Sequence, residues 1–294
     1  MLLIDSNMLV RKCYAKLDFL ENEEGRKTGM EFGFLQTLEK LQGLHTKAQI
    51  VMCWDSPKNL RKEKCPEYKA NRTPMPDGFW ARVKEFRETL LNHLYPYAAL
   101  DGYEADDVIA TLALLNASEK RHVYIFADDA DFMQLVSPCI TQIKSFQSQL
   151  YYWDIPKVRE RYGVNPIEMP LFRAFIGDKS DNLQGVKRLH RAILAVRIIE
   201  TRGITNVKER VLKMLSDEGS WSAAMFENLL EFVKSGKFMM NYQLMKLKPV
   251  KGVELVPSDG DAKAVTKWLT MMNIKSLRMC AKYLGKIEKE GEEF

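Results

Sequence analysis

Acidic residues occur in three groups whose spacing suits metal chemistry. The groups are Glu104, Asp106 and Asp107; Asp128, Asp129 and Asp131; and Asp178 and Asp181. Carboxylates as close as those of the first group repel one another unless a cation neutralises them, and no Lys or Arg stands among them. Acids also favour the first turn of a helix, but capping needs one acid rather than three. The first group therefore indicates a metal site.

The other two groups are more ambiguous when each is considered alone. Aspartate is common in turns and at helix N-caps, which is the alternative interpretation for both groups. The group at 128–131 directly follows an apolar run, as Asp5 and Asp55 follow two others, and this shared position favours a role in a site. Asp178 and Asp181 stand in a glycine-containing stretch, for which turn formation is the better explanation on its own.

Basic residues are concentrated on both sides of the acidic centre. Residues 58–72 carry a net charge of +4 and residues 184–213 a net charge of +6, whereas residues 101–131 carry −6. Such flanks suit an enzyme of nucleic acids, because they would neutralise phosphates while the acids hold metal ions. The alternative is a set of solvated helix faces, and charge alone does not decide between the two.

Composition and missing motifs exclude several other classes. The chain has 294 residues, a net charge of +5 and 46% hydrophobic residues, which is typical of a globular protein with a buried core. The five cysteines and four histidines are scattered, which argues against a zinc site or disulfide framework and favours a reduced, cytoplasmic protein. The motifs GxSxG and GxxxxGK[ST] are absent. No membrane span or signal peptide is expected. Any chemistry must therefore rest on carboxylates.

The elements that would position these acids follow from short apolar runs. Residues 2–4, 50–54 and 123–127 are predicted to be buried parallel strands, with helices around 30–44, 79–94 and 104–116 between them. This alternation predicts an α/β fold with a mostly parallel central sheet flanked by helices. Sites in such sheets form at the carboxyl ends of the strands, where each run delivers an aspartate.

The first acidic group opens a predicted helix. Ala105, Val108, Ile109 and Leu112 follow the i, i+3, i+4, i+7 pattern of a buried stripe, and Glu104 and Asp107 project together from another face.

A hairpin and a helical second lobe are predicted further along. Residues 140–146 and 150–154 resemble the two strands of a hairpin. Helices are expected at 156–162, 168–176, 189–201, 206–217, 221–235 and around 262–284, with a charged tail from 288 that frays.

Six short motifs occur in order along the chain. They are IDSN at 4–7, CWDS at 53–56, YKANR at 68–72, YEADD at 103–107, DADFMQL at 129–135 and GDKSDN at 177–182. On these motifs the sequence resembles the 5′ nucleases of the flap endonuclease family, and within it the ribonuclease H branch of T-even-type phages, over roughly residues 2–250.

The resemblance implies a ligand set and a domain plan. Its metal-binding acids match Asp5, Asp55, Glu104, Asp106, Asp107, Asp129, Asp131, Asp178 and Asp181. Asp128 has no clear counterpart. The implied fold is that of a PIN-like 5′ nuclease: a core over 1–175, with an arch or gateway at 56–95, and a helical DNA-binding lobe over 176–294.

Two basic segments have implied roles in binding nucleic acid. Tyr68, Lys69 and Arg72 match the gateway motif for single-stranded 5′ ends. Lys187, Arg188 and Arg191 lie in the helix–three-turn–helix-like region that grips duplex backbone, where Arg188 and His190 replace the usual glycines. We expect side chains to take over the phosphate contacts there.

The resulting hypothesis is a Mg²⁺-dependent 5′-to-3′ exonuclease and flap endonuclease. Two ions, replaceable by Mn²⁺, would act on DNA flaps, nicks and RNA·DNA primers for primer removal in phage replication. Asp55, Asp107, Asp129 and Asp131 are expected nearest the scissile phosphate, with Lys69 and Arg72 neutralising its charge. Expected partners are DNA and RNA·DNA hybrids with 5′ ends, a single-strand-binding protein and a sliding clamp. A monomer in the host-cell cytoplasm is expected.

Two alternatives remain open. One is a catalytically silent, structure-specific DNA-binding protein of the same fold, against which the intact acid set argues. The other is a haloacid-dehalogenase-like phosphatase, which needs an aspartate two residues after the first, whereas Asp5 is followed by Ser6 and Asn7.

Overall fold

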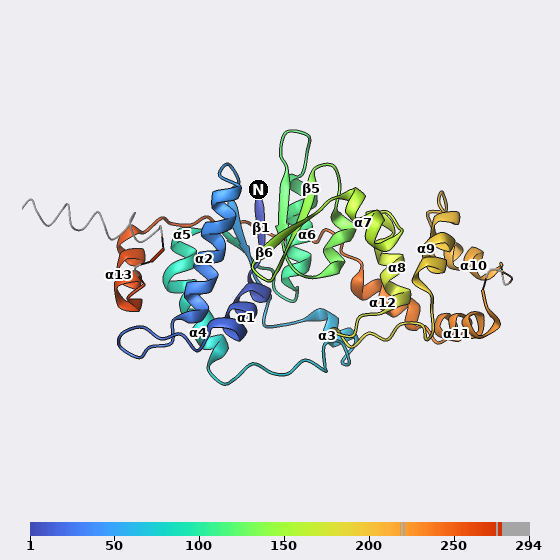
Figure 1. Cartoon of the computed structure of the whole chain (residues 1–294), viewed down its shortest axis with the longest axis horizontal. Helices are drawn as coiled ribbons and strands as arrows, with labels where there is room; N and C mark the ends of the chain where they lie inside the picture. The colour runs from blue at the N-terminus through green and yellow to red at the C-terminus, as the bar shows by residue number, and fades with distance from the viewer. Residues whose placement is uncertain (218, 220, 275, 278–294) are drawn as a thin grey trace, which may run out of the picture. The chain divides into compact units, whose positions relative to one another are not determined.

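The computed structural model (Figure 1) describes residues 1–217, 219, 221–274, 276 and 277. Its chain divides into two compact units. Unit 1 consists of Met1–Ser56, Pro74–Ile109 and the chain from Lys251, and unit 2 consists of Pro57–Thr73 and Ala110–Val250. Six strands form a mostly parallel sheet flanked by helices, as the sequence predicts. The expected division at residue 175 stays a prediction. No helix of the described residues could span a membrane.

Unit 1 holds three parallel strands. β1 (Leu2–Asp5) pairs with β2 (Ile50–Cys53), and β2 pairs with β3 (Tyr97–Ala98). Leu2, Leu3 and Ile4 are fully buried, which explains why the first strand is a continuous apolar run. Asp5 lies opposite Cys53, so Asp5 and Asp55 leave the sheet at the same edge. The sequence does not predict β3, which is only two residues long.

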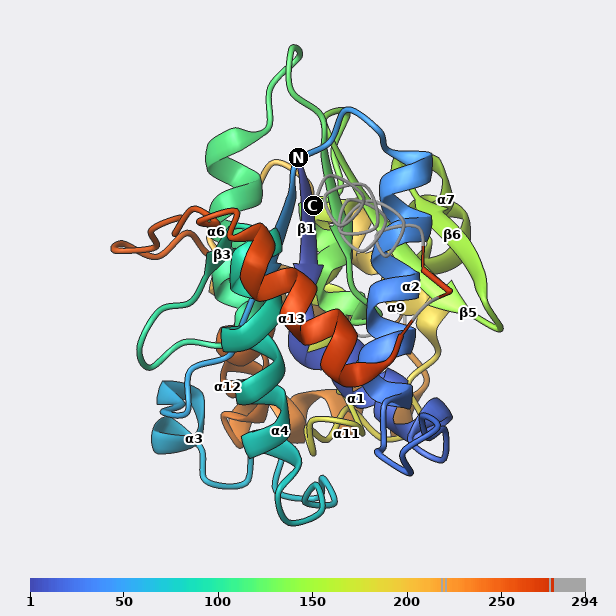
Figure 2. The same ribbon diagram turned by 90° about the vertical axis from the view of Figure 1, so that its left-hand side faces the viewer.

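The helices of unit 1 pack on one another through apolar faces. They are α1 (Ser6–Leu17), α2 (Gly29–Leu44), α4 (Phe79–Phe86), α5 (Asn92–Leu94) and α13 (Ala262–Met272), with a π-helical turn η1 (Arg87–Leu91) between α4 and α5. α1 lies against α2, and α13 lies against η1 and α5, as Figure 2 shows. The close approach of α1 and α2 requires Gly29, because a Cβ there would meet the carbonyl oxygen of Leu17 at 1.7 Å.

Three elements of unit 1 differ from the expectations. The sequence does not predict α1, which follows β1 without a loop. The helix expected over 79–94 is broken by η1. The final helix ends at Met272, after which Asn273 adopts a left-handed φ of 51°. Residues 278–284 of that expected helix, and the tail from 288, lie outside the described residues.

Unit 2 holds three strands, including the predicted hairpin. β4 (Val123–Phe126) pairs in parallel with β5 (Ile140–Phe146), which pairs antiparallel with β6 (Gln149–Trp153). α6 (Ala105–Asn116) begins in unit 1 and ends in unit 2. Ala105, Val108, Ile109 and Leu112 are all buried, which confirms the predicted apolar stripe.

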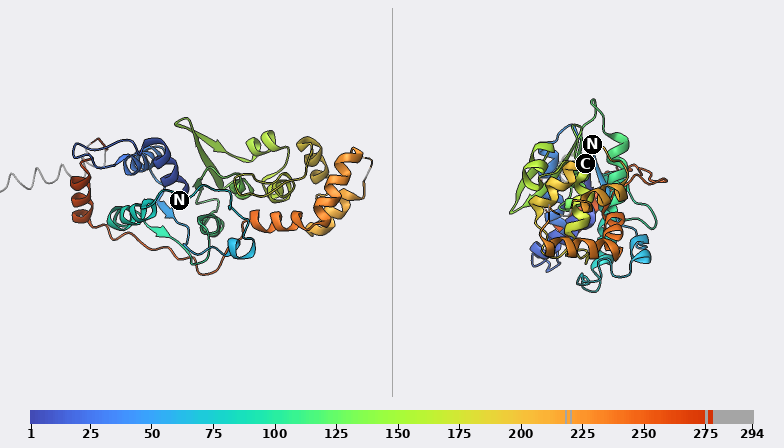
Figure 3. Two further views of the ribbon diagram at one scale, coloured as in Figure 1. Left: turned by 90° about the horizontal axis from the view of Figure 1, so that it is seen from below. Right: turned by 90° about the vertical axis from the view of Figure 1, so that its right-hand side faces the viewer.

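Helices make up most of the remainder of unit 2, as the sequence predicts. They are α3 (Leu60–Lys64), α7 (Ile155–Tyr162), α8 (Met169–Ile176), α9 (Arg191–Glu200), α10 (Val207–Leu215), α11 (Ala223–Lys234) and α12 (Lys237–Met245), with 3₁₀ turns η2 (Ala130–Leu135) and η3 (Pro166–Glu168). The sequence does not predict α3 or α12. α9 to α12, gold to orange in Figures 1 and 3, share a core with α8 that includes Phe172, Phe175 and Leu229.

Candidate active site

Two strand-end aspartates of unit 1 are fixed by backbone hydrogen bonds. Asp5 ends β1 and caps α1, where its Oδ1 accepts a hydrogen bond from the N–H of Met8 at 2.9 Å. The N–H of Asp55 donates to Oδ1 of Asn7 at 2.9 Å. Oδ1 of Asp55 accepts from the N–H of Ala105, the first residue of α6, at 2.8 Å. These bonds join the motifs IDSN, CWDS and YEADD within unit 1.

The acids at the start of α6 are largely buried. Glu104 is 5% exposed and Asp107 7% exposed, and Asp106 beside them is half-buried. The N–H of Glu104 lies 3.4 Å from Oδ2 of Asp107, which holds the two residues together. Buried carboxylates need hydrogen bonds or a cation to offset lost hydration. Oxygen donors of this kind, with Asp55 tied to the same helix start, fit the preference of a hard divalent ion.

Three acids of unit 2 surround one arginine that sequence reasoning missed. Arg173, in the last turn of α8, places Nε 2.9 Å from Oδ1 of Asp131 and one terminal nitrogen 2.5 Å from Oδ2 of Asp178. The same nitrogen lies 4.0 Å from Oδ1 of Asp129. Asp129 also caps η2 by accepting from the N–H of Asp131 at 2.7 Å. The structure therefore brings these three predicted acids together around a guanidinium.

The acids and the arginine change one another's proton affinity. Burial, with Asp129 adding to it, raises the pKa of Asp131 to about 7, although Arg173 opposes the shift. Burial would lower the pKa of Arg173, but Asp131, Asp129 and Asp178 raise it overall, so the guanidinium stays charged. The pKa of Asp178 is lowered: burial opposes this, but hydrogen bonds from Ser180 and the charge of Arg173 prevail.

The loop with Asp178 and Asp181 is a tight turn. Asp178 and Leu183 exchange backbone hydrogen bonds of 2.8 and 2.7 Å, and Oδ1 of Asp178 accepts from the N–H and hydroxyl of Ser180, both at 2.7 Å. Gly177 has a φ of 75°, and a Cβ there would lie 2.4 Å from the nitrogen of Gly185. The turn explanation is thus correct for the local structure, and the turn holds both carboxylates in fixed places.

The predicted gateway segment is hydrogen-bonded to this same turn. A terminal nitrogen of Arg72 lies 2.6 Å from Oδ1 of Asp181, and its Nε donates to the carbonyl oxygen of Ser180 at 3.3 Å. Nδ2 of Asn71 donates to the carbonyl oxygen of Lys179 at 2.7 Å, and Nδ2 of Asn182 donates to that of Glu67 at 2.9 Å. Burial, partly offset by Lys69 and then Arg72, raises the pKa of Asp181.

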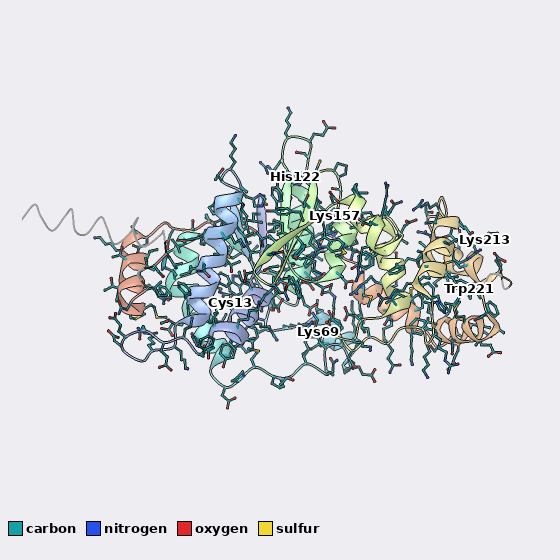
Figure 4. All side chains as sticks on the ribbon, in the orientation of Figure 1. Cys13, Lys69, His122, Lys157, Lys213 and Trp221 are labelled. Carbon is teal, nitrogen blue, oxygen red and sulfur yellow. The ribbon has the colours of Figure 1, made fainter. Side chains whose placement is uncertain are left out.

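Lys69 and Tyr68 occupy special positions in the segment. Lys69, labelled in Figure 4, has a φ of 58°, and its N–H donates to the carbonyl oxygen of Asp181 at 2.9 Å. Its Nζ lies 4.8 Å from the ring centroid of Tyr68, a cation–π contact. Tyr68 is 3% exposed and belongs to a cluster with Leu183 and Met245. Tyr68 thus anchors the segment in the described conformation.

The basic turn before α9 presents its side chains to solvent. Lys187, Arg188 and Arg191 are exposed, and Arg188 has a φ of 56°, a conformation that usually favours glycine. Gly185 cannot be replaced in the same way, because a Cβ there would lie 2.0 Å from the carbonyl oxygen of Ile176. The turn therefore keeps one glycine for packing and carries arginine at a glycine-like position.

The donor chemistry fits a divalent ion, although no metal group is ready-made. Among the described residues, no three His, Cys, Asp or Glu side chains are arranged so that they could hold a metal ion. In unit 2 the positive charge between the carboxylates comes from Arg173. Asp128, which has no counterpart in the family, accepts a hydrogen bond from the N–H of Ser145 at 3.1 Å and so supports β5.

Comparison with known proteins identifies the family. A family model described as the 5′-3′ exonuclease, N-terminal resolvase-like domain, matches residues 1–163. The chain belongs to the 5′-3′ exonuclease family. The prediction of an enzyme of the 5′ nuclease type is thus confirmed at the level of this family. The closer resemblance to the phage ribonuclease H branch stays a prediction.

Individual relatives agree with this membership. The chain is similar to a 5′-3′ exonuclease of Aquifex aeolicus, with 28% identity over 258 residues that cover 87% of this chain and 84% of that protein. It is 31% identical to DNA polymerase I of Bacillus caldotenax over 63% of this chain but spans only 22% of that protein. A flap endonuclease of bacteriophage T5, solved with DNA and metal ions, has a TM-score of 0.63 at 17% identity, covering 92% of this chain and 94% of that chain. This last likeness shows the fold alone.

Proposed function

We propose that this exonuclease-family chain is a Mg²⁺-dependent 5′-to-3′ exonuclease and flap endonuclease that acts on DNA flaps, nicks and RNA·DNA primers. The observation that carries the proposal is that β1, β2 and β4 are each followed by acids of the expected set, Asp5, Asp55 and Asp129. Primer removal in phage replication, beside a single-strand-binding protein and a sliding clamp, is part of the proposal.

Nine carboxylates would hold the ions. They are Asp5, Asp55, Glu104, Asp106, Asp107, Asp129, Asp131, Asp178 and Asp181. When bound, Mg²⁺ makes a water more acidic and stabilises the leaving 3′ oxygen of an in-line displacement. The chain's own contribution is to fix the ligands. Asp55 is held by Asn7 and Ala105, and Asp178 by Ser180, so little freedom is lost when the acids act together.

Basic residues of unit 2 would bind the nucleic acid. Lys69 and Arg72 would neutralise the charge that develops at the scissile phosphate, and the turn beside them fixes their backbone. Lys187, Arg188 and Arg191 would contact duplex phosphates through side chains. Arg173 would hold Asp131 and Asp178 in place until ions bind.

A second candidate function is a catalytically silent DNA-binding protein of the same fold. Arg173 and Arg72 favour it, because they already neutralise Asp131, Asp178 and Asp181 without any ion. The active enzyme requires that divalent ions compete with these arginines.

One gel separates the two candidates. We would incubate 5′-labelled flap, nicked and RNA·DNA substrates with the full chain and Mg²⁺, and repeat the reactions with excess EDTA. The proposal predicts short 5′ products on all three substrates with Mg²⁺ and none with EDTA. Binding of the flap without cleavage in Mg²⁺ or Mn²⁺ would support the silent protein, and products that persist in EDTA would contradict metal dependence.

A further inference from the structure

A large aromatic side chain of unit 1 is left open to solvent. Trp80, the second residue of α4, is 43% exposed, whereas Trp54, Trp221 and Trp268 are at most 6% exposed. Tryptophan is the most effective side chain for stacking on flat π systems and cations. Neither the acids nor the basic segments described above involve Trp80.

The ring of Trp80 is held in a fixed orientation. Phe79 meets it edge-on, with centroids 4.8 Å apart and planes at 79°, and Phe79 itself is 3% exposed. Tyr14 on α1 meets Phe79 edge-on in turn, at 4.9 Å. The guanidinium carbon of Arg11, also on α1, lies 4.9 Å from the Trp80 ring centroid. An exposed ring anchored on a buried one loses little entropy when a ligand stacks on it.

The charges around the ring favour a polyanion. Lys84 lies one helical turn beyond Trp80 on the exposed face of α4, and Lys12 follows Arg11 on α1. Acids of the neighbourhood are matched by other arginines: Glu85 pairs with Arg26 at 3.4 Å. Asp18 and Glu31 both pair with Arg82, at 2.6 and 2.5 Å.

We infer that Trp80, with Arg11 against its ring, is a stacking platform for one base of a single-stranded nucleic acid, and that Lys84 and Lys12 attract the adjoining phosphates. Only a single strand fits, because the bases of a duplex are stacked on one another and offer no free face. The inference rests on the proposed function, to which it adds a binding site for the single-stranded part of the substrate.

The test measures binding of a labelled oligothymidylate, with EDTA present so that no cleavage is needed. Trp80→Ala should bind about fivefold or more weakly, since one base–aromatic stack contributes at least about that factor. Trp80→Phe should retain part of the affinity. Phe146→Ala, which removes another exposed aromatic side chain on β5, should bind like wild type. Thermal unfolding confirms that each variant is folded.

A second measurement needs no variant. Trp80 is the most exposed of the five tryptophans, so a stacked base should quench the fluorescence of the wild-type protein, whereas an oligonucleotide of abasic sites should not. Equal binding of wild type and Trp80→Ala, or equal binding of oligothymidylate and the abasic strand, would overturn the platform. Cleavage of the flap by wild type is scored separately, so loss of the proposed function would be seen there and not in these binding curves.

Discussion

Nε of Arg173 lies 2.9 Å from Oδ1 of Asp131, and the same guanidinium reaches Asp178, so one arginine of α8 connects two acidic motifs. The side chains of Arg173 and Asp131 are each only 13% exposed. Removing one partner from a buried ion pair leaves an uncompensated charge, which costs more than the pair itself contributes.

Arg173→Met should therefore destabilise the metal-free protein by about 3 kcal/mol. The variant should also gain more stability from saturating Mg²⁺ than wild type does, because ions would replace the missing charge. Denaturant unfolding with and without Mg²⁺ measures both effects. Arg161→Met, an exposed arginine of α7, serves as the control and should behave like wild type. Equal stability of Arg173→Met and wild type without metal would show that the guanidinium does not provide this stabilisation.

Glu168 provides a pH-dependent test of the helical part of unit 2. Its carboxylate is 2% exposed and accepts two hydrogen bonds of 2.8 Å from Arg202 and one of 2.8 Å from the N–H of Asn165. Burial opposes the shift, but the hydrogen bond from Arg202 and then that from Asn165 lower the pKa of Glu168 below its ordinary value. The carboxylate therefore stabilises the fold above the unfolded-state pKa, and this contribution is lost as the pH falls through the lowered, folded-state pKa.

Glu168→Gln should accordingly cost about 1–2 kcal/mol at neutral pH, because hydrogen bonds to a charged group weaken. The difference from wild type should shrink in acid, where wild type also loses the charge. Chemical denaturation at several pH values measures it, with Glu160→Gln on the exposed face of α7 as the control. A cost that does not change with pH would argue against the ionic contribution.

Lys69→Ala and Arg72→Ala should lower the single-turnover cleavage rate more than the affinity for a flap. Their charges would act on phosphate in the transition state, whereas binding energy is spread over many contacts. Lys58→Ala removes an exposed charge of the same segment and should change both quantities little. Losses of affinity with unchanged single-turnover rates would reduce the two residues to general electrostatic attraction.

Replacing Lys187, Arg188 and Arg191 together with alanine should weaken binding to substrates with a downstream duplex. The slope of log K against log salt should fall in magnitude by about one unit for each phosphate that is no longer neutralised, so by up to about three. Binding to single strands should change less. Alanine at Lys208, Lys213 and Lys234 removes the same charge from other exposed helix positions and should leave the slope nearly unchanged. Identical slopes for the two triple variants would place the duplex grip elsewhere.

The sequence predicts features that depend on local pattern. Continuous burial of Leu2, Leu3 and Ile4 appears as an apolar run, and the buried stripe of α6 appears as a helical period. It does not predict α1, because Asp5 ends a strand and caps a helix at once and leaves no loop signal between them. β3 depends on pairing with β2 rather than on its own two residues.

The candidate site shows the same limit. The acids could be found from their spacing, but Arg173 comes from a helix whose only signal is a basic residue in its last turn. The pairing of Arg72 with Asp181 links residues 109 positions apart, which no local pattern indicates. Tertiary contacts of this kind decide which charges the acids meet, and sequence spacing alone cannot provide them.

The central claim is that the acids after the strands bind the ions that cut the phosphodiester. The most direct measurement compares single-turnover cleavage of a 5′-labelled flap in Mg²⁺ by wild type, Asp129→Asn, Asp131→Asn and Asp128→Asn. Asp129→Asn and Asp131→Asn should lose several orders of magnitude in rate while still binding the flap, because an amide cannot replace a carboxylate at Mg²⁺. Asp128→Asn, whose carboxylate supports β5, should stay close to wild type. Cleavage by Asp129→Asn or Asp131→Asn within about tenfold of wild type, roughly 1.4 kcal/mol of barrier, would contradict the assignment.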